Sequence, residues 1–188
     1  MLDNTEDILN GFAKRVIQQS RTRLTKGKSN YNKKLYNSLD FDLTVAGNMF
    51  ILKFLMEEYG MYQDKGVKGK NPSKVSPNAK KTGQQAPNSP YRFGTGSSSG
   101  TFAQFAKRMG VWAKAKRIRF RDSNGKYAKG NYQSLGYVIA KNIYNRGITP
   151  TNFFTKSFEQ AFDKLPKELV DAYKLDLEEF LTSATSGN

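Results

Sequence analysis

The chain has 188 residues, a net charge of +15, and neither histidine nor cysteine. This length suits one domain with a real core. The two missing residue types exclude disulfides, histidine or cysteine zinc sites, and nucleophiles that depend on imidazole or thiolate. We therefore expect a non-enzymatic protein with no catalytic residue, no metal and no cofactor.

The charge is distributed unevenly along the chain. Residues 65–156 contain 19 Lys and Arg side chains but only one acid, Asp122, whereas residues 157–188 contain three Lys and seven acids. Segregated charge of this kind favours anionic partners at one end of the molecule and head-to-tail pairing between copies.

The first predicted element is a helix over about residues 5–25, with an apolar stripe at helical spacing. Thr5 or Asp3 is the expected N-cap, and Gly27 the expected stop. Residues 32–39 predict a short helix or the lead into a strand. Alternating residues around the turn signal Gly47-Asn48 then predict a β-hairpin over about 40–56.

The composition changes at residue 63. Residues 63–100 are rich in Gly, Pro, Ser and Lys and predict a long flexible loop, in which Tyr91-Arg92-Phe93 is a possible anchor. Residues 101–146 predict a basic helical insertion: a helix over 101–116, a strand or extended arm over 117–121, a turn over 122–125, and a helix over 132–145 that ends at Gly147.

The C-terminal region predicts helices from about Phe154 to Phe180, with one apolar face that includes Tyr173 and Leu177. Pro166 must kink this region or begin a second helix. Residues 182–188 are expected to fray. The predicted fold is α+β, a single domain over 1–188 in which a small antiparallel sheet packs against the N-terminal and C-terminal helices. The expected core residues are Phe41, Leu43, Ile51, Phe54, Phe158 and Phe162.

No apolar run is long enough to cross a membrane, and the acidic N-terminus does not resemble a signal peptide. We expect a chain made in a cytoplasm with no membrane partner. The glycine-rich residues 94–101 miss the spacing of phosphate-binding loops and predict a plain loop.

Basic and aromatic residues interleave over 107–121, which is the pattern of nucleic-acid backbone contact. The alternative is a solvated charged surface around a core helix that buries Trp112. The candidate nucleic-acid-binding residues are Lys107, Arg108, Lys114, Lys116, Arg117, Arg119 and Arg121. A third hypothesis, a metal-dependent nuclease built on Glu57, Glu58 and Asp64, lacks converging carboxylates.

Three stretches together carry a resemblance to a known family. Leu35 and Ser38-Leu39 precede the hairpin, a tyrosine-acid-glycine pattern follows it, and a proline–phenylalanine-rich stretch enters the last helices. The second and third patterns comprise Tyr59, Tyr62, Asp64 and Gly66, then Pro150, Phe153, Phe154, Phe158 and Phe162. In this order they are similar to the tail-completion, or head–tail joining, proteins of tailed phages, over about residues 5–69 and 147–181. Residues 70–146 exceed the short connection usual in that family.

The resemblance implies a structural virion protein, a ring-forming neck or tail-completion adaptor between the portal side and the tail. The expected partners of the chain are further copies in a homo-oligomeric ring and other neck, tail or portal proteins. DNA is a further expected partner, contacted without sequence specificity. The alternative is a phage-encoded nucleic-acid-binding protein that uses residues 107–121. The candidate subunit-interface residues are Glu57, Glu58, Tyr59, Tyr62 and Asp64.

Overall fold

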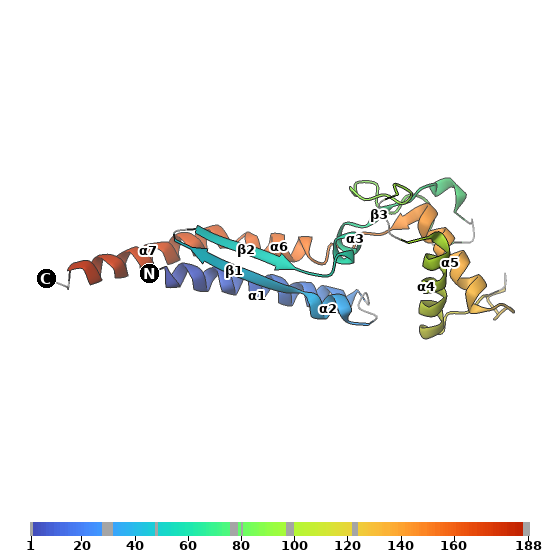
Figure 1. Ribbon diagram of the computed structural model, residues 1–188, viewed down its shortest axis with the longest axis horizontal. Helices are drawn as coiled ribbons and strands as arrows, with labels where there is room; N and C mark the ends of the chain where they lie inside the picture. The colour runs from blue at the N-terminus through green and yellow to red at the C-terminus, as the bar shows by residue number, and fades with distance from the viewer. Residues whose placement is uncertain are drawn as a thin grey trace. The chain divides into compact units, whose positions relative to one another are not determined.

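A computed structural model describes residues 2–27, 32–47, 49–75, 79, 81–96, 100–121 and 124–185. The fold is α+β, as predicted (Figure 1). Its elements, in chain order, are α1 (Asp3–Lys26), α2 (Lys34–Ser38), β1 (Asp40–Ala46), β2 (Met49–Leu55), α3 (Tyr59–Lys65), β3 (Val67–Lys68), η1 (Pro72–Lys74), α4 (Phe102–Ala115), α5 (Tyr132–Arg146), β4 (Gly147–Ile148), α6 (Thr155–Phe162) and α7 (Leu165–Thr185).

The chain divides into two compact units. Unit 1 combines Met1–Gly60 with Thr151–Asn188, and unit 2 is Met61–Pro150. The sequence led us to expect a single domain with a loop and an insertion. The segment that exceeds the family pattern, residues 70–146, falls within unit 2.

The hairpin of unit 1 is an antiparallel pair in which Phe41 faces Phe54 and Leu43 faces Leu52. Successive residues of a strand point to opposite faces, so these four side chains share the half-buried face. That face lies against α1 and α6 (Figure 1). Ile51 points the other way and is 37% exposed, so the prediction that it belongs to the core is wrong.

Phe54 joins the hairpin to the helices of unit 1. Its ring lies 6.2 Å from that of Phe12, 5.3 Å from that of Phe154 and 6.0 Å from that of Phe158, each nearly perpendicular. Such edge-to-face pairs add to the free energy of burying the rings. Phe162 stacks on Phe158 but is 47% exposed, so its predicted place in the core is also wrong.

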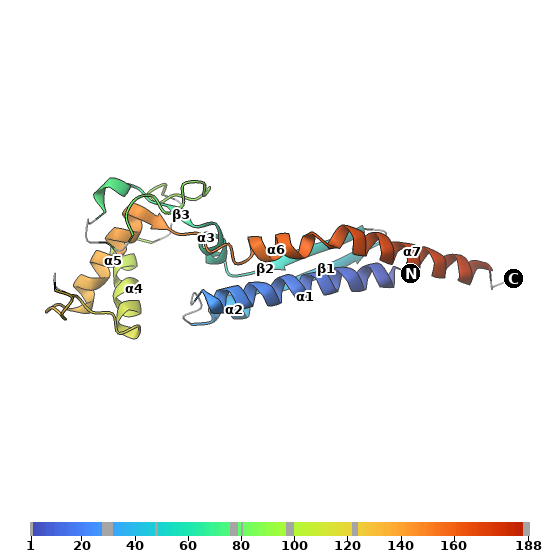
Figure 2. The same cartoon turned by 180° about the vertical axis from the view of Figure 1, so that it is seen from behind.

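Helix α1 runs antiparallel to α6 and α7. The guanidinium of Arg15 forms a two-pronged ion pair with Glu168, and Arg23 donates a hydrogen bond of 2.9 Å to Gln160. In both views α7 continues past the N-terminus of α1 (Figures 1 and 2). Residues 182–185 belong to α7 and are not frayed, whereas 186–188 lie outside the described residues.

The N-terminus of α1 is capped by a carboxylate from the other end of the chain. Asp176 of α7 is 2% exposed and accepts hydrogen bonds of 3.0 Å from the backbone N–H groups of Asn4 and Thr5. The Thr5 hydroxyl donates a further bond of 2.5 Å to it. The predicted N-caps are therefore wrong: Leu2 takes that position without a side-chain bond, and Thr5 is a donor.

Burial alone would raise the pKa of Asp176, but the hydrogen bonds from Thr5 and Asn4 outweigh it and hold the pKa below its usual value. A carboxyl group with a depressed pKa in the folded state stabilises the fold above its unfolded pKa, about 3.9. That contribution is lost as the pH falls through the folded pKa.

We predict that Asp176→Ala lowers the free energy of unfolding by about 1–3 kcal/mol at pH 7, since it leaves buried N–H groups without an acceptor. The difference from the wild-type chain should shrink as the pH falls below about 4. Urea unfolding at several pH values measures both effects. Asp171→Ala, at an exposed position of α7, is the control and should change little. An equal loss in the two variants at pH 7 would contradict the capping role.

Unit 2 is centred on the close contact of α4 with α5. The facing residues are small: Ala106, Gly110 and Ala113 on α4 meet Gly136 and Ala140 on α5, all of them buried. A Cβ atom at Gly136 would lie 2.4 Å from the carbonyl oxygen of Ala106 and 2.5 Å from the nitrogen of Gly110. The two backbones can approach this closely only because side chains are absent there.

The stretch 63–100 is more structured than the predicted loop. Strand β3 pairs antiparallel with β4, and Lys68 also bridges to Arg92. The predicted anchor is confirmed, because Tyr91 packs on Tyr62 at 4.6 Å and Phe93 joins a group of rings. The other members of this group come from α4 and α5, and are Phe102, Phe105, Tyr137 and Tyr144. Rings spaced far apart in the sequence thus order a stretch of low apolar content.

We predict that Gly136→Ala destabilises unit 2 by about 1–3 kcal/mol or more, because the added methyl group meets backbone atoms that cannot rotate away. Gly11→Ala in α1 is the matched control. A Cβ atom at Gly11 meets no atom within 4 Å, so this change should stabilise α1 by about 0.5–1 kcal/mol. Thermal unfolding with hydrogen exchange at α4 and α5 distinguishes the two effects. Unchanged exchange in Gly136→Ala would show that the helices are packed less closely.

Candidate functional site

Three of the predicted interface residues lie at the end of the hairpin in unit 1. Glu57 forms an ion pair of 2.9 Å with Lys34, and its backbone N–H donates to the Ser38 hydroxyl at 3.0 Å. The Glu57 carboxylate raises the pKa of Lys34. Glu58 is exposed, and Tyr59 is 38% exposed, with its pKa raised by partial burial and by Glu57. Glu57 is therefore already engaged within the subunit, while Glu58 and Tyr59 are open to a partner.

The other two predicted interface residues lie in unit 2. Tyr62 is 36% exposed and rests its ring on Tyr91. Asp64 is only 1% exposed, so its carboxylate lies in the interior and is not at a surface that another subunit could reach. The five candidates therefore do not form one surface patch on a single unit.

A more extensive apolar surface lies on α7. One face of this helix, with Leu165, Ala172 and Asp176, is buried. A second set of apolar side chains recurs at spacings of three and four on a different face, turned about 100° from the first. We call it the α7 stripe: Val170, Tyr173, Leu177, Phe180 and Leu181, which are 55%, 50%, 42%, 47% and 60% exposed.

The sequence pattern had merged these two faces into one. It placed Tyr173, Leu177 and Phe180 on the same apolar face as Leu165 and Leu169, which pack on the core. The buried position of Asp176 separates them, since it shows which side of α7 meets α1. A helical plot that separated the two apolar stripes would have pointed to the exposed one.

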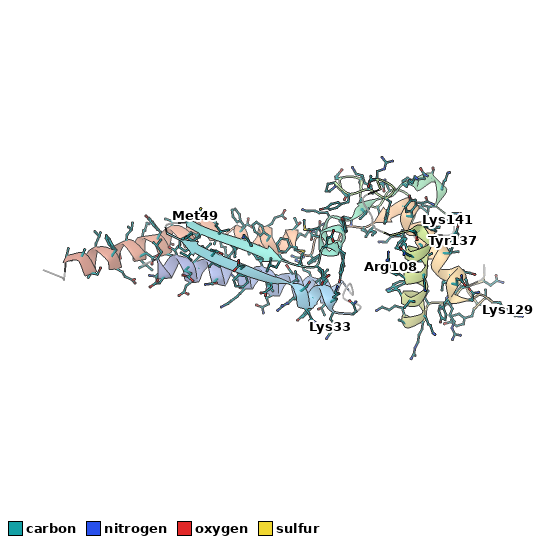
Figure 3. All side chains as sticks on the ribbon, viewed as in Figure 1. Lys33, Met49, Arg108, Lys129, Tyr137 and Lys141 are labelled. Carbon is teal, nitrogen blue, oxygen red and sulfur yellow. The ribbon has the colours of Figure 1, made fainter. Side chains whose placement is uncertain are left out.

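The outer face of the hairpin is also partly apolar. Met49 is 56% exposed and Leu55 is 49% exposed, on either side of Ile51 along β2. Met49 is labelled in Figure 3 at the start of this strand. Lys53, which faces Asp42, separates Leu55 from Met49 and Ile51, so this apolar surface is smaller and less continuous than the α7 stripe.

The candidate nucleic-acid-binding residues of unit 2 all reach solvent. Lys107, Arg108 and Lys114 lie on exposed positions of α4, and Lys116, Arg117, Arg119 and Arg121 follow it, also exposed. Arg108 is labelled beside α4 in Figure 3. Lys107 and Lys114 are seven residues apart and therefore lie on the same side of the helix, two turns from one another. Trp112 is half-buried.

The chain after α4 forms an arm, which we define as residues 117–121 and 124–129; residues 122 and 123 of the predicted turn lie outside the described residues. The arm folds back on itself, since Arg121 bridges to Tyr127 and Ala128 donates to the Phe120 carbonyl at 3.0 Å. Phe120 packs on Gly130, where a Cβ atom would lie 2.3 Å from its ring. The predicted strand or extended arm over 117–121 has no regular strand in the structure: Arg117 adopts a left-handed turn, and only Arg121 makes an isolated bridge.

Two arginines of the arm share one aromatic ring. The guanidinium carbons of Arg119 and Arg121 lie 5.6 Å and 4.7 Å from the centre of the Tyr127 ring. The Arg121 guanidinium also donates to the Gly125 carbonyl at 2.7 Å. Tyr127 is itself 65% exposed. Sequence reasoning missed Tyr127, although its position just after the Asn124-Gly125 turn places it opposite the alternating arginines.

Arg117 ends α4 in a conformation that glycine usually adopts. Its φ is +54°, and the N–H groups of Arg117 and Ile118 donate to the carbonyls of Lys114 and Ala113 at 3.0 Å and 2.9 Å. This is the Schellman pattern of helix ends, in which the left-handed residue is normally Gly. An L-residue pays about 1–2 kcal/mol for that conformation.

No group of three or more acidic side chains that could hold a metal ion occurs in the part of the chain that the structure describes. The nuclease hypothesis on Glu57, Glu58 and Asp64 thus gains no support. None of the helices described has the length and hydropathy that a membrane span requires.

No protein-family model, no curated protein and no solved structure matches this chain. The likeness to tail-completion proteins therefore stays a prediction from the sequence motifs.

We predict that Arg117→Gly raises the thermal unfolding midpoint by about 2–6 °C, because relief of the left-handed strain exceeds the entropy that glycine adds to the unfolded chain. Lys116→Gly is the control: its φ of −84° is ordinary, so glycine there should lower the midpoint. Calorimetry of the full chain measures both. A lower midpoint for Arg117→Gly would show that the arginine side chain contributes more than its backbone costs.

Proposed function

We propose that this chain is a non-enzymatic structural subunit of a tailed-phage particle, a neck or tail-completion adaptor that assembles with copies of itself into a ring. The observation that carries the proposal is the α7 stripe, five exposed apolar side chains along one face of a helix whose neighbouring face, about 100° away, is already packed. A helix that is apolar on two faces normally buries both of them.

The charge of unit 1 suits self-association. Unit 1 contains 13 Lys and Arg side chains and 14 carboxylates, so copies can approach through it without strong repulsion. The hairpin adds two strand edges without a partner strand in the described chain, which natural proteins commonly cover. The assignment to a phage particle is based on the three sequence motifs, which resemble those of tail-completion proteins and occur in the same order.

The chain contains no cysteine, so one introduced thiol reports on a single position. We predict that Leu177→Cys is protected from a maleimide reagent in assembled particles, because the α7 stripe is covered there. Leu175→Cys is the matched control: it lies on the same helix and is 50% exposed, but it is outside the α7 stripe, so it should react. Mass spectrometry of the labelled particles measures both.

Equal labelling of the two thiols in particles would show that the α7 stripe is not part of the subunit interface. Particles purified from infected cells that contain no copy of the chain would overturn the proposed function itself. Leu177→Asp, tested against Leu175→Asp, adds a third measurement, since only the former should prevent ring assembly.

A further inference from the structure

Unit 2 has a basic surface that is separate from the α7 stripe, on which the proposed self-assembly depends. It contains 18 Lys and Arg side chains and two carboxylates, Asp64 and Asp122, so the whole net charge of the chain resides there. Asp64 is buried, and Asp122 lies outside the described residues. The described surface of unit 2 therefore offers no carboxylate to compensate its cations.

We propose that the exposed side of α4 and the arm bind the phosphodiester backbone of a nucleic acid without reading its sequence. Six side chains carry the contact: Lys107, Lys114, Arg117, Arg119, Arg121 and Lys129. All six are exposed, and Figure 3 labels Lys129 at the end of the arm. Cations that neutralise successive phosphates release counterions, and this release drives binding.

The geometry of the arm favours a nucleic acid over an acidic protein or a lipid surface. The planar guanidinium groups of Arg119 and Arg121 are held against the Tyr127 ring, and Arg121 is further fixed by its bond to the Gly125 carbonyl, so both cations are oriented before a ligand arrives. Tyr127 is 65% exposed beside them, and exposed aromatic rings of this kind are what nucleobases stack on. Lipid headgroups and acidic side chains can also pair with guanidinium groups, but they offer no aromatic base to stack on Tyr127.

Arg117 supports the same assignment. Glycine would end α4 without strain, yet an arginine occupies the left-handed position and projects a cation at the start of the arm. Backbone strain of this kind concentrates where a side chain has a function that outweighs its cost. The anchoring of Phe120 on Gly130 then sets the alternation that turns Arg119 and Arg121 outward.

The test is fluorescence anisotropy of the full chain with a labelled oligonucleotide of mixed sequence, single-stranded or duplex, over about 50–200 mM salt. For six phosphate contacts, the logarithm of affinity should fall with the logarithm of salt concentration with a slope of about −4 to −5. Arg119→Gln together with Arg121→Gln should reduce that slope by about 2 and weaken binding at least about tenfold.

Two double variants with the same change of charge are controls. Lys53→Gln with Lys164→Gln removes two exposed cations of unit 1, and Lys74→Gln with Lys141→Gln removes two exposed cations of unit 2 away from the arm. Both should weaken binding clearly less than the arginine pair. An equal loss in the second control would mean that charge is diffuse over unit 2, which would overturn the assignment to the arm.

Tyr127→Ala separates stacking from charge, because it should lower affinity for single strands about fivefold or more and leave the salt slope unchanged. A larger effect on single strands than on duplex identifies the single strand as the preferred form. If the arginine variants fold poorly by circular dichroism, Arg117→Gly replaces them, with binding weakened while the unfolding midpoint rises. Absence of salt-dependent binding to either oligonucleotide, or tighter binding to anionic vesicles, would overturn the proposal.

Discussion

Repulsion among the cations of unit 2 must be overcome by packing, since carboxylates are almost absent from residues 61–150. The helices α4 and α5 meet through glycine and alanine, so their backbones gain close dispersion contacts. The rings of Phe93, Phe102 and Tyr144 then cover one end of the helix pair. A unit stabilised by uncharged contacts leaves nearly all of its Lys and Arg side chains at the surface.

Unit 1 is stabilised differently. Arg15 with Glu168, and Asp176 on the N-terminus of α1, link helices that are far apart in the sequence. The bond from Asp176 also fixes the rotation of α7 about its own axis, because the carboxylate must face the N–H groups of α1. That rotation turns Tyr173 and Leu177 outward. The capping contact therefore determines which apolar face of α7 is left exposed.

Local signals in the sequence predicted most of the elements. Gly27 and Gly147 end α1 and α5, Gly47 has a φ of +62° in the hairpin turn, and α7 begins beside Pro166. Each of these depends on the conformational preference of a single residue, which the sequence states directly. The basic residues of the arm could likewise be identified from the sequence alone.

Contacts between residues that lie far apart in the sequence could not be predicted from such local signals. The bond between Thr5 and Asp176 spans 171 residues, and no local pattern indicates it. Periodicity gave the spacing of Leu169, Tyr173 and Leu177, but it could not tell which of two overlapping faces meets the core. Ile51 and Phe162 were assigned to the core for the same reason: hydrophobicity indicates what benefits from burial, and only the packing shows where a neighbour covers it.

The two candidate surfaces differ in how they depend on salt, which follows from their chemistry. Burial of the α7 stripe is a hydrophobic contact, and salts that are excluded from protein surfaces strengthen such contacts. Contact between the arm and phosphate groups weakens steeply as the salt concentration rises, because the counterions released on binding then gain less entropy. Because the net positive charge resides in unit 2 and the α7 stripe in unit 1, the two proposed contacts together imply self-association at a salt concentration that would release a nucleic acid. A chain that mixed both residue types on one surface could not separate these two equilibria.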